Sequence, residues 1–334
     1  MRVLVVKMSS LGDVIHTLPA LSDARQALPG IRFDWVVEEG FAEIPSWHPA
    51  VERVVPVAIR RWRRQPFSAA TRREWGWARQ ALRAQSYDAV IDAQGLLKSA
   101  LITRLVAAPR YGMDRATARE GLASFAYDYR VHVPRDQHAV ERTRQLFSGA
   151  LDYPRPAAPG DYGLGVGPAG TTVAGGGELP PGLLFFHGTA RDDKLWPEDH
   201  WVALAGLAAA AGLPQYLPWG NTSERLRAER IAARSGSARV LPKLSLSELA
   251  TMLRRAPAAV AVDTGLGHLA AALDVPAVSL YGPTSTRLVG AYGRRQVHIQ
   301  SPLAGDGCAT AAALMAAITP EAVWQALLPA LAGR

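Results

Sequence analysis

The stretch VLVVKMSSLGD (residues 3–13) decides the fold, because it joins a buried strand directly to a polar, glycine-containing loop. Val3–Val6 is a short continuous apolar run, as expected for a parallel strand covered on both faces. Ser9, Ser10 and Gly12 make a tight loop whose backbone donors can approach a ligand, and Asp13 stands where the loop enters a helix. This is how a doubly wound α/β domain begins.

Short apolar runs and helical stretches alternate along both halves of the chain, which predicts two parallel, doubly wound sheets. The predicted strands are Val3–Val6, Phe33–Val37, Val54–Val57 and Ala89–Ile91, then Leu183–Phe186, Gln215–Pro218, Ala258–Val262 and Ala277–Tyr281. The predicted helices are Leu18–Leu28, Arg72–Gln85 and Leu97–Ala107, then His200–Ala211, Ser223–Arg234, Ser247–Arg255 and Leu266–Leu273.

Pro, Gly, Ala and Thr dominate residues 153–182, so this segment is interpreted as an interdomain connector, with an ordered surface loop as the alternative. We therefore expect an N-terminal Rossmann-like domain (1–152), the connector (153–182), a C-terminal Rossmann-like domain (183–318) and a final helix (319–334). Two such halves joined by a hinge would face a cleft, with ligands beyond the carboxyl ends of the strands.

The composition is globular: 49% of the 334 residues are apolar and 20% are charged, and this length suits two domains. Cys308 is the single cysteine, so no internal disulfide can form, which fits a reducing compartment. No secretory signal opens the sequence, and no apolar stretch approaches the roughly 18 residues of a membrane span. We expect a soluble cytoplasmic protein.

The net charge of +8 comes almost entirely from arginine, since lysine occurs only at Lys7, Lys98, Lys194 and Lys243. Guanidinium groups bind phosphate and carboxylate in a fixed bidentate geometry. Such a basic surface suits nucleic acid, anionic lipid headgroups or a phosphorylated substrate.

Asp13 is the first candidate for chemistry. A carboxylate at the end of a strand can accept a proton from an attacking hydroxyl. The alternative is that Asp13 is only a helix N-cap. The loop is neither a Walker motif nor GxGxxG, so it gives no support to an ATPase or a dehydrogenase.

The stretch VDTGLGH (residues 262–268) again joins an apolar strand to a helix. Thr264, Gly265 and Gly267 leave backbone N–H groups open at a helix N-terminus, which suits a pyrophosphate. Asp263 can cap the helix, and His268 can reach a ligand from the first turn, although a lone helical His is more often structural.

The stretch HGTARDDK (residues 187–194) follows another predicted strand. Lys194 can neutralise a phosphate there. The alternative is a solvated turn in which Asp192, Asp193 and Lys194 merely pair at the surface.

The stretch RRWRR (residues 60–64) places four guanidinium groups around one indole, as an anion clamp would. Nucleic-acid binding and a solvated charged face are the alternatives. No RRM, KH, helix-turn-helix or zinc-finger pattern accompanies it. The sequence also contains no HExxH and no GxSxG, so neither a metal site nor a nucleophile elbow is predicted.

Taken with their spacing, these loops resemble the heptosyltransferase I family of lipopolysaccharide core synthesis. The resemblance covers most of the chain and is weakest in the connector and after Ser301. The blocks that carry it are KMSSLGDVIHTLPAL, FDWVVEEGFAEIPSWHPAVERVVPVAIRRWRR, YDAVIDAQGLLKSA, QHAVERTRQLF, RDDKLWPEDHW, LPWG, VDTGLGHL and YGPT.

The resemblance implies a GT-B fold and an inverting, metal-independent transfer of L-glycero-D-manno-heptose from ADP-heptose to the first Kdo of Kdo2-lipid A. It implies Asp13 as the general base, no cofactor, no nucleic-acid partner, and peripheral contact with the cytoplasmic face of the inner membrane. The oligomeric state is open, with a monomer favoured. The implied acceptor-binding residues are Ser10, Arg60, Arg61, Arg63, Arg64, Arg119 and Arg142. The implied donor-binding residues are Thr189, Ala190, Lys194, Glu224, Leu244, Asp263, Thr264, Gly265 and His268.

Two departures from the family pattern remove possible donors, since Ala190 and Gly267 stand where hydroxyl residues are usual or frequent. We expect activity to survive, because neither position is the base or the lysine. The alternatives are a heptosyltransferase II-type enzyme that adds a later heptose, which shares both loops, and a basic nucleic-acid-binding protein. The RRWRR and VVEEGFAEIPSWHP blocks favour the first enzyme.

Overall fold

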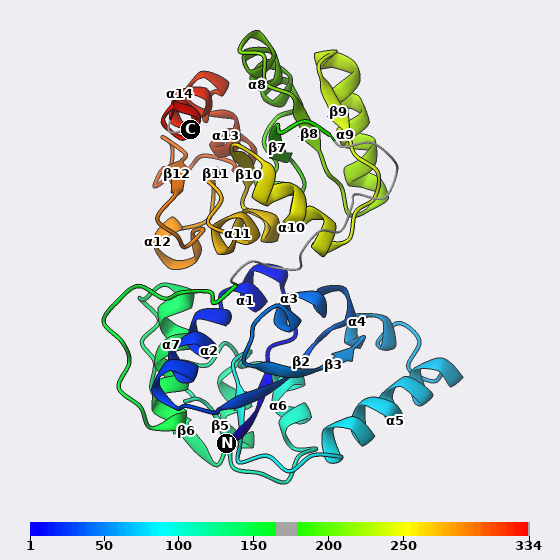
Figure 1. The fold of residues 1–334 in the computed structure, drawn as a ribbon, viewed down its shortest axis with the longest axis vertical. Helices are drawn as coiled ribbons and strands as arrows, with labels where there is room; N and C mark the ends of the chain where they lie inside the picture. The colour runs from blue at the N-terminus through cyan, green and yellow to red at the C-terminus, as the bar shows by residue number, and fades with distance from the viewer. Residues whose placement is uncertain (165–178, 333–334) are drawn as a thin grey trace. The chain divides into compact units, whose positions relative to one another are not determined.

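The computed structural model describes residues 1–164 and 179–332, and the chain divides into two compact units, Met1–Gly165 and Val166–Arg334. Each unit is built on one six-stranded sheet (Figure 1). All strand pairs within both sheets are parallel. The predicted α/β class with two doubly wound parallel sheets is confirmed.

The sheet of the first unit has the strand order β3-β2-β1-β4-β5-β6, the Rossmann order in which the direction of strand addition reverses between the first and fourth strands. Its strands are β1 (Arg2–Val6), β2 (Arg32–Glu38), β3 (Val51–Val57), β4 (Ala89–Asp92), β5 (Arg110–Met113) and β6 (Tyr129–Val131). The sequence predicted the first four and missed β5 and β6. β6 is an edge strand with two exposed residues out of three, so it lacks the apolar run that marks the others.

Helices cover both faces of this sheet (Figure 1). Helices α5 and α6 pack on one face, where Leu4, Leu82 and Ile102 belong to one buried cluster. Helix α7 lies on the other face, where Phe147 and Phe33 have ring centroids 6.1 Å apart. The helices are α1 (Leu11–Ile15), α2 (Leu18–Ala27), η1 (Glu39–Phe41), α3 (Glu43–Ser46), α4 (Ile59–Trp62), α5 (Ala69–Arg83), α6 (Leu97–Thr103), η2 (Gly121–Ala126) and α7 (Ala139–Leu151).

The second unit repeats the topology, since the order β12-β11-β10-β7-β8-β9 is the same Rossmann order. Its strands are β7 (Leu183–Phe186), β8 (Gln215–Leu217), β9 (Ala238–Val240), β10 (Ala259–Val262), β11 (Ala277–Tyr281) and β12 (Gln296–Gln300). Its helices are η3 (Asp192–Lys194), α8 (Glu198–Ala210), α9 (Thr222–Ser235), α10 (Leu246–Arg255), α11 (Gly265–Ala272), α12 (Thr286–Val289), α13 (Ala311–Ala316) and α14 (Pro320–Ala332). The edge strands β9 and β12 contain no fully buried residue and lack a continuous apolar run, so the sequence pattern missed them.

Aromatic side chains anchor the core of the second unit. The Trp201 ring lies 5.0 Å from Trp196 and 5.3 Å from Phe185, and all three side chains are buried. Val323 and Leu327 of α14 join the same cluster. The predicted C-terminal helix is therefore present as α14 and packs into the core of the second unit.

The first part of the predicted connector lies against the first unit. Arg144 donates to the carbonyl oxygens of Pro156 (3.1 Å) and Ala158 (2.9 Å), and the buried Tyr153 hydroxyl donates to Ala20 O (3.4 Å). Residues 165–178 of the connector lie outside the described residues. The guanidinium of Arg144 thus ties this segment to helices α2 and α7.

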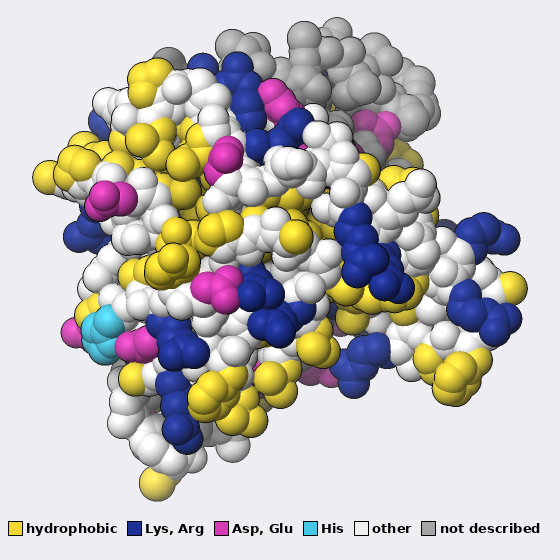
Figure 2. Space-filling view, turned by 90° about the horizontal axis from the view of Figure 1, so that it is seen from below, with side chains coloured by type: hydrophobic (Ala, Val, Ile, Leu, Met, Phe, Trp, Pro, Cys, Tyr) yellow, Lys and Arg dark blue, Asp and Glu magenta, His cyan; other side chains and the backbone are white. Residues whose placement is uncertain are grey.

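No helix among residues 1–164 and 179–332 is long and apolar enough to cross a membrane. Figure 2 shows one face on which Lys and Arg side chains are interspersed with hydrophobic ones.

Arg144→Met is expected to destabilise the first unit, because Arg144 is 2% exposed and its Nε lies 2.6 Å from Asp23 Oδ2. Removing one partner of a buried ion pair costs about 3–5 kcal/mol, which corresponds to a fall in Tm of roughly 10 °C. Differential scanning calorimetry measures this. Arg155→Ala is the matched control, since Arg155 makes an exposed ion pair with Glu141 and its loss should lower Tm by no more than about 2 °C. Equal melting temperatures for both variants would contradict the structural role of Arg144.

Candidate active site

The loops after β1 and β4 meet at the topological switch point of the first sheet, where ligands bind in doubly wound folds. The side-chain oxygen of Gln94 accepts hydrogen bonds from Met8 N (3.0 Å) and Ser9 N (3.1 Å). Asp92 in turn accepts from Gln94 N (2.9 Å) and Gly95 N (3.0 Å). The loop after β4 therefore fixes the backbone of the loop after β1.

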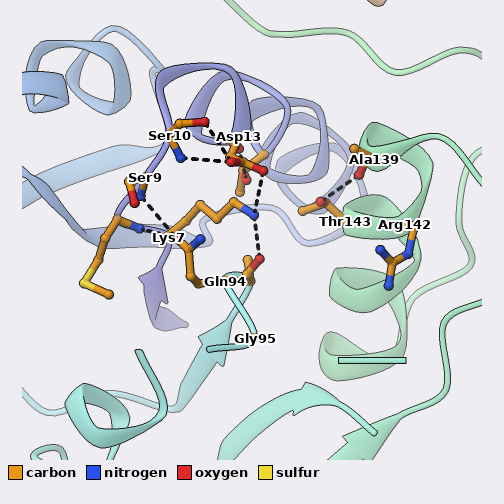
Figure 3. A network of polar contacts seen from close by, with 12 residues as sticks. Lys7, Ser9, Ser10, Asp13, Gln94, Gly95, Ala139, Arg142 and Thr143 are labelled. Atoms are coloured by element: carbon orange, nitrogen blue, oxygen red, sulfur yellow. Dashed lines mark hydrogen bonds and ion pairs between the residues drawn. The ribbon is translucent and has the colours of Figure 1, made fainter. Parts of the chain in front are cut away.

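Asp13 lies at this switch point with defined partners (Figure 3). Its Oδ2 accepts from Ser10 N (2.9 Å) and Ser10 Oγ (3.0 Å), while its Oδ1 lies 3.7 Å from Lys7 Nζ. Lys7 Nζ also donates to Ala93 O (2.8 Å). The interpretation of Asp13 as the N-cap residue is wrong. Ser10 is the N-cap residue of α1, and Asp13, the third residue of the helix, accepts a hydrogen bond from the Ser10 backbone.

The pKa of the Asp13 carboxyl is lowered from its usual value of 3.8. Burial by itself raises this pKa, but the Lys7 ammonium, the hydrogen bonds from Ser10 and the more distant Arg119 outweigh burial. The side chain keeps 32% of its surface exposed, so a substrate can reach it. Asp13 is thus an ionised, accessible carboxylate at neutral pH, as a proton acceptor has to be.

The sequence did not assign a role to Lys7 or Gln94. Both lie in blocks that carry the family resemblance, and Lys7 is one of only four lysines, which was a usable signal. The role of Gln94 depends on the pairing of β4 with β1, and the sequence does not reveal which residues of these two strands lie opposite each other.

Two of the predicted acceptor-binding arginines lie near this site. Arg119 acts electrostatically on Asp13. Arg142, on α7, appears in the same close view as the Lys7–Asp13 pair without contacting it (Figure 3), and its guanidinium donates to Thr117 O (2.8 Å). Within the described residues Arg142 forms no ion pair, its Nε is buried without a partner, and burial lowers its pKa. A half-buried guanidinium without a carboxylate partner among the described residues is suited to bind an anion.

The RRWRR segment differs from the predicted clamp. Trp62 is buried, packs edge-on against Trp75 at 5.7 Å and donates to Glu74 (2.6 Å), so its indole is not available to stack on a base or ligand. Arg61 is already bound by Glu39 and Glu74. The remaining arginines of the segment, Arg60, Arg63 and Arg64, are exposed.

The second candidate site lies at the equivalent switch point between β7 and β10. Lys194 Nζ donates to Asp263 Oδ2 at 2.6 Å, and Thr189 Oγ1 donates to Asp263 O at 2.9 Å. The Lys194 and Asp263 side chains are 17% and 9% exposed. The surface-turn alternative for Lys194 was therefore wrong, because its partner is Asp263, 69 residues away, while Asp193 pairs with Arg191.

Helix α11 begins beside this pair. Thr264 is its N-cap residue and Gly265 its first residue, so the positive end of the helix dipole lies next to Lys194. His268 is 7% exposed in the following turn. A lysine and a helix N-terminus at one switch point form a site suited to phosphate groups.

The other predicted donor-binding residues surround the same strand ends. Glu224 Oε2 accepts from Gly220 N (2.7 Å), and a Cβ on Gly188 would come within 2.7 Å of the Glu224 carboxyl carbon. Leu244 lies between β9 and α10 and is partly exposed, and Ala190 is exposed in the loop after β7. These positions stay predictions as ligand contacts. In the part of the chain that the structure describes, no three His, Cys, Asp or Glu side chains gather as metal ligands would.

Comparison with known proteins agrees with this arrangement. Residues 75–315 match the family model for glycosyltransferase family 9 (heptosyltransferase). Lipopolysaccharide heptosyltransferase 1 of Pseudomonas aeruginosa is 58% identical over 90% of this chain and 84% of its own length. Lipopolysaccharide heptosyltransferase 2 of Salmonella typhimurium is 26% identical over 85% of this chain and 84% of its own length.

Solved structures show the same likeness. E. coli heptosyltransferase WaaC with ADP superposes with a TM-score of 0.89 at 50% identity, covering 99% of this chain and 100% of that chain. E. coli heptosyltransferase WaaC with ADP-2-deoxy-2-fluoro heptose gives 0.85 at 49% identity, covering 98% and 99%.

Two Rossmann-like units with a site at each switch point constitute a GT-B glycosyltransferase fold. The chain belongs to glycosyltransferase family 9, the heptosyltransferases.

Lys7→Met is expected to move the acid limb of the pH profile of kcat/KM to higher pH, by about one unit. The Lys7 cation favours the ionised form of Asp13, so the Asp13 pKa rises when this cation is removed. Activity would then be lost at a higher pH as the pH falls. Initial rates measured from about pH 3 upward define the limb, since the parent limb lies below the usual Asp value of 3.8. Lys7→Arg keeps the charge and should keep the limb in place; an unmoved limb in Lys7→Met would show that the pair is only structural.

Proposed function

We propose that this chain transfers L-glycero-D-manno-heptose from ADP-heptose to the first Kdo of Kdo2-lipid A in lipopolysaccharide inner-core synthesis. The observation that supports this proposal is the Lys194–Asp263 pair beside the α11 N-terminus, where the Lys194 ammonium and the first backbone amides of α11 would bind a diphosphate. The names of the similar proteins support the donor and the acceptor, since two of them are a heptosyltransferase with ADP and with a fluorinated ADP-heptose.

The second unit would hold the donor. Lys194 and the first backbone amides of α11 would bind the two phosphates, and the hydroxyl of Thr189 and the neighbouring Thr264 lie at the same strand ends. Their positive charge would stabilise ADP as it departs, when negative charge develops on the bridging oxygen. The adenine would lie near Leu244, and Glu224 beside Gly188 would contact the nucleoside or the sugar.

The first unit would supply the base. The oxygen of the Kdo hydroxyl would attack the anomeric carbon of the heptose, and its proton would pass to Asp13. The bond from that carbon to the phosphate oxygen would break, and its electron pair would leave with ADP. A single displacement of this kind inverts the anomeric centre and requires no cofactor. We propose that the positive groups of the donor site make a metal ion unnecessary.

The acceptor's carboxylates and phosphates would be bound by cations of the first unit. Arg142 and Arg119 are the best placed of these. Arg142 has no carboxylate partner in the described part of the chain, and Arg119 acts electrostatically on Asp13. Arg60, Arg63 and Arg64 are exposed for the same role. Arg61 would have to exchange Glu39 and Glu74 for the acceptor.

The rival functions have less support. A heptosyltransferase II-type activity corresponds to relatives at 26% identity, against 58% for heptosyltransferase 1. Nucleic-acid binding loses the aromatic platform it would need, because Trp62 is buried. We propose a monomer that acts at the cytoplasmic face of the inner membrane, where the lipid-linked acceptor is held.

The donor and acceptor are tested directly by mass spectrometry of the lipid product. ADP-heptose with Kdo2-lipid A should add one heptose, while ADP-mannose and UDP-glucose should react poorly. An acceptor that already carries one heptose should gain nothing; its elongation would identify a heptosyltransferase II-type enzyme instead. Nuclear magnetic resonance of the product reports inversion, and unchanged rates in excess EDTA report metal independence.

Asp13→Asn and Lys194→Ala are expected to fail in different ways. Asp13→Asn keeps an oxygen for Ser10 but cannot accept a proton, so kcat should fall by about 10²–10⁴-fold with ADP affinity preserved. Lys194→Ala should weaken ADP binding by roughly 10–100-fold, because a charged hydrogen bond is lost. Isothermal titration calorimetry with ADP and initial rates separate the two effects.

Lys243→Ala is the control, since Lys243 is exposed in the same unit. Weak ADP binding by Asp13→Asn would refute the assignment of Asp13 as the base.

A further inference from the structure

Four large apolar side chains are exposed on two short helices of the first unit. Leu97 (46% exposed) and Leu101 (69%) lie on α6, and Leu122 (59%) and Phe125 (63%) lie on η2. We call these four residues the α6–η2 patch. Large apolar side chains exposed together on a protein surface mark a site of interaction, whereas single ones do not.

The two helices pack against each other, which brings the two exposed pairs onto neighbouring helices of the first unit. Ala100 of α6 and Ala123 of η2 share a small buried cluster with Tyr127. Leu97 and Leu101 are four residues apart on an α-helix, and Leu122 and Phe125 are three apart on a 3₁₀-helix, so each pair lies on one face of its helix.

The residues around the patch are mainly cationic. Lys98 and Arg104 flank the leucines of α6, Arg115 lies 6.0 Å from the Phe125 ring centroid, and Arg130 donates to Ser124 O. Three carboxylates lie nearby, of which Asp128 is neutralised by an arginine, so the four cations outnumber the remaining two. Glu120 accepts from Leu97 N, Asp128 binds Arg110, and Asp114 binds His132 and Thr117. An apolar surface with a basic margin is complementary to an anionic lipid bilayer.

The patch begins at the proposed acceptor site. Glu120 N donates to Gly95 O at 2.9 Å, and Gly95 follows Gln94, which holds the loop before Asp13. Arg119, which acts on Asp13, precedes Glu120 in the chain. A lipid surface in contact with the patch would therefore lie close to the carboxylate that receives the acceptor hydroxyl.

We propose that the α6–η2 patch docks this protein onto an anionic phospholipid bilayer, with its leucines and Phe125 entering the interfacial region and its cations contacting lipid phosphates. The inference rests on the proposed function, because an acceptor anchored by acyl chains stays in the membrane while its sugar is modified. Docking beside Asp13 lets the enzyme take the sugar without extracting the lipid.

The test measures binding of the full chain to sedimenting vesicles, either phosphatidylcholine alone or phosphatidylcholine with about one third phosphatidylglycerol. The protein should prefer the anionic vesicles, and high salt should weaken this preference. Leu101→Ser should weaken binding about fivefold and Leu101→Ser with Phe125→Ser about thirtyfold, since each removes apolar area from the interface. Leu226→Ser is the matched control, because Leu226 is 51% exposed on α9 of the second unit. This variant should bind vesicles as the parent does.

Activity on two acceptors separates this inference from the proposed function. With a deacylated, soluble Kdo2 acceptor, the double variant should keep the parent kcat and KM, and with acceptor embedded in vesicles its KM should rise in step with the lost binding. Failure of the parent to use the soluble acceptor would reject the proposed function and leave the vesicle result standing. Equal vesicle binding by the parent and the double variant would overturn the inference. So would a parent dimer in sedimentation velocity that the double variant no longer forms, because the patch would then bind a second copy of the chain.

Discussion

The structure depends on one constraint: in each sheet the first strand of the unit pairs in parallel with its fourth. Val6 lies opposite Asp92 in the β1–β4 pair, and Phe186 lies opposite Ala261 in the β7–β10 pair. The chain leaves neighbouring strand ends in opposite directions at these points, which is where doubly wound folds bind ligands. Both candidate sites lie there, because the loops that follow the two paired strands meet at these points.

Each site contains a lysine paired with an aspartate, yet the two pairs are built differently. Lys194 and Asp263 are in direct contact at 2.6 Å and are largely buried, which fixes the position of the ammonium group. Lys7 and Asp13 are 3.7 Å apart, and Asp13 is bound more closely by Ser10. The looser pair leaves one carboxylate oxygen free to receive a proton, while the cation keeps the carboxylate ionised.

The first unit combines three properties that a lipid-linked acceptor requires. It has an accessible carboxylate at Asp13, a guanidinium at Arg142 without a carboxylate partner in the described residues, and an exposed apolar surface beginning two residues beyond Gly95. The second unit carries the complementary property, a strand-end ammonium group and a helix N-terminus where a diphosphate would bind. The two candidate sites differ because the two units share one strand order but carry different residues in the loops at their strand ends.

The sequence by itself determined the class of fold, eight of the twelve strands in the described residues, and both loops that bear the candidate base and the candidate phosphate site. Buried strands have continuous apolar runs, and strand-end loops have distinctive glycine and aspartate patterns, so both are visible locally. Only the tertiary structure decided that Gln94 holds the Asp13 loop, that Lys194 pairs with Asp263, that Trp62 is buried, and that α6 and η2 pack against each other. Those facts depend on contacts between residues that are distant in the chain, and the polar edge strands depend on backbone pairing, neither of which leaves a periodic signal in the sequence.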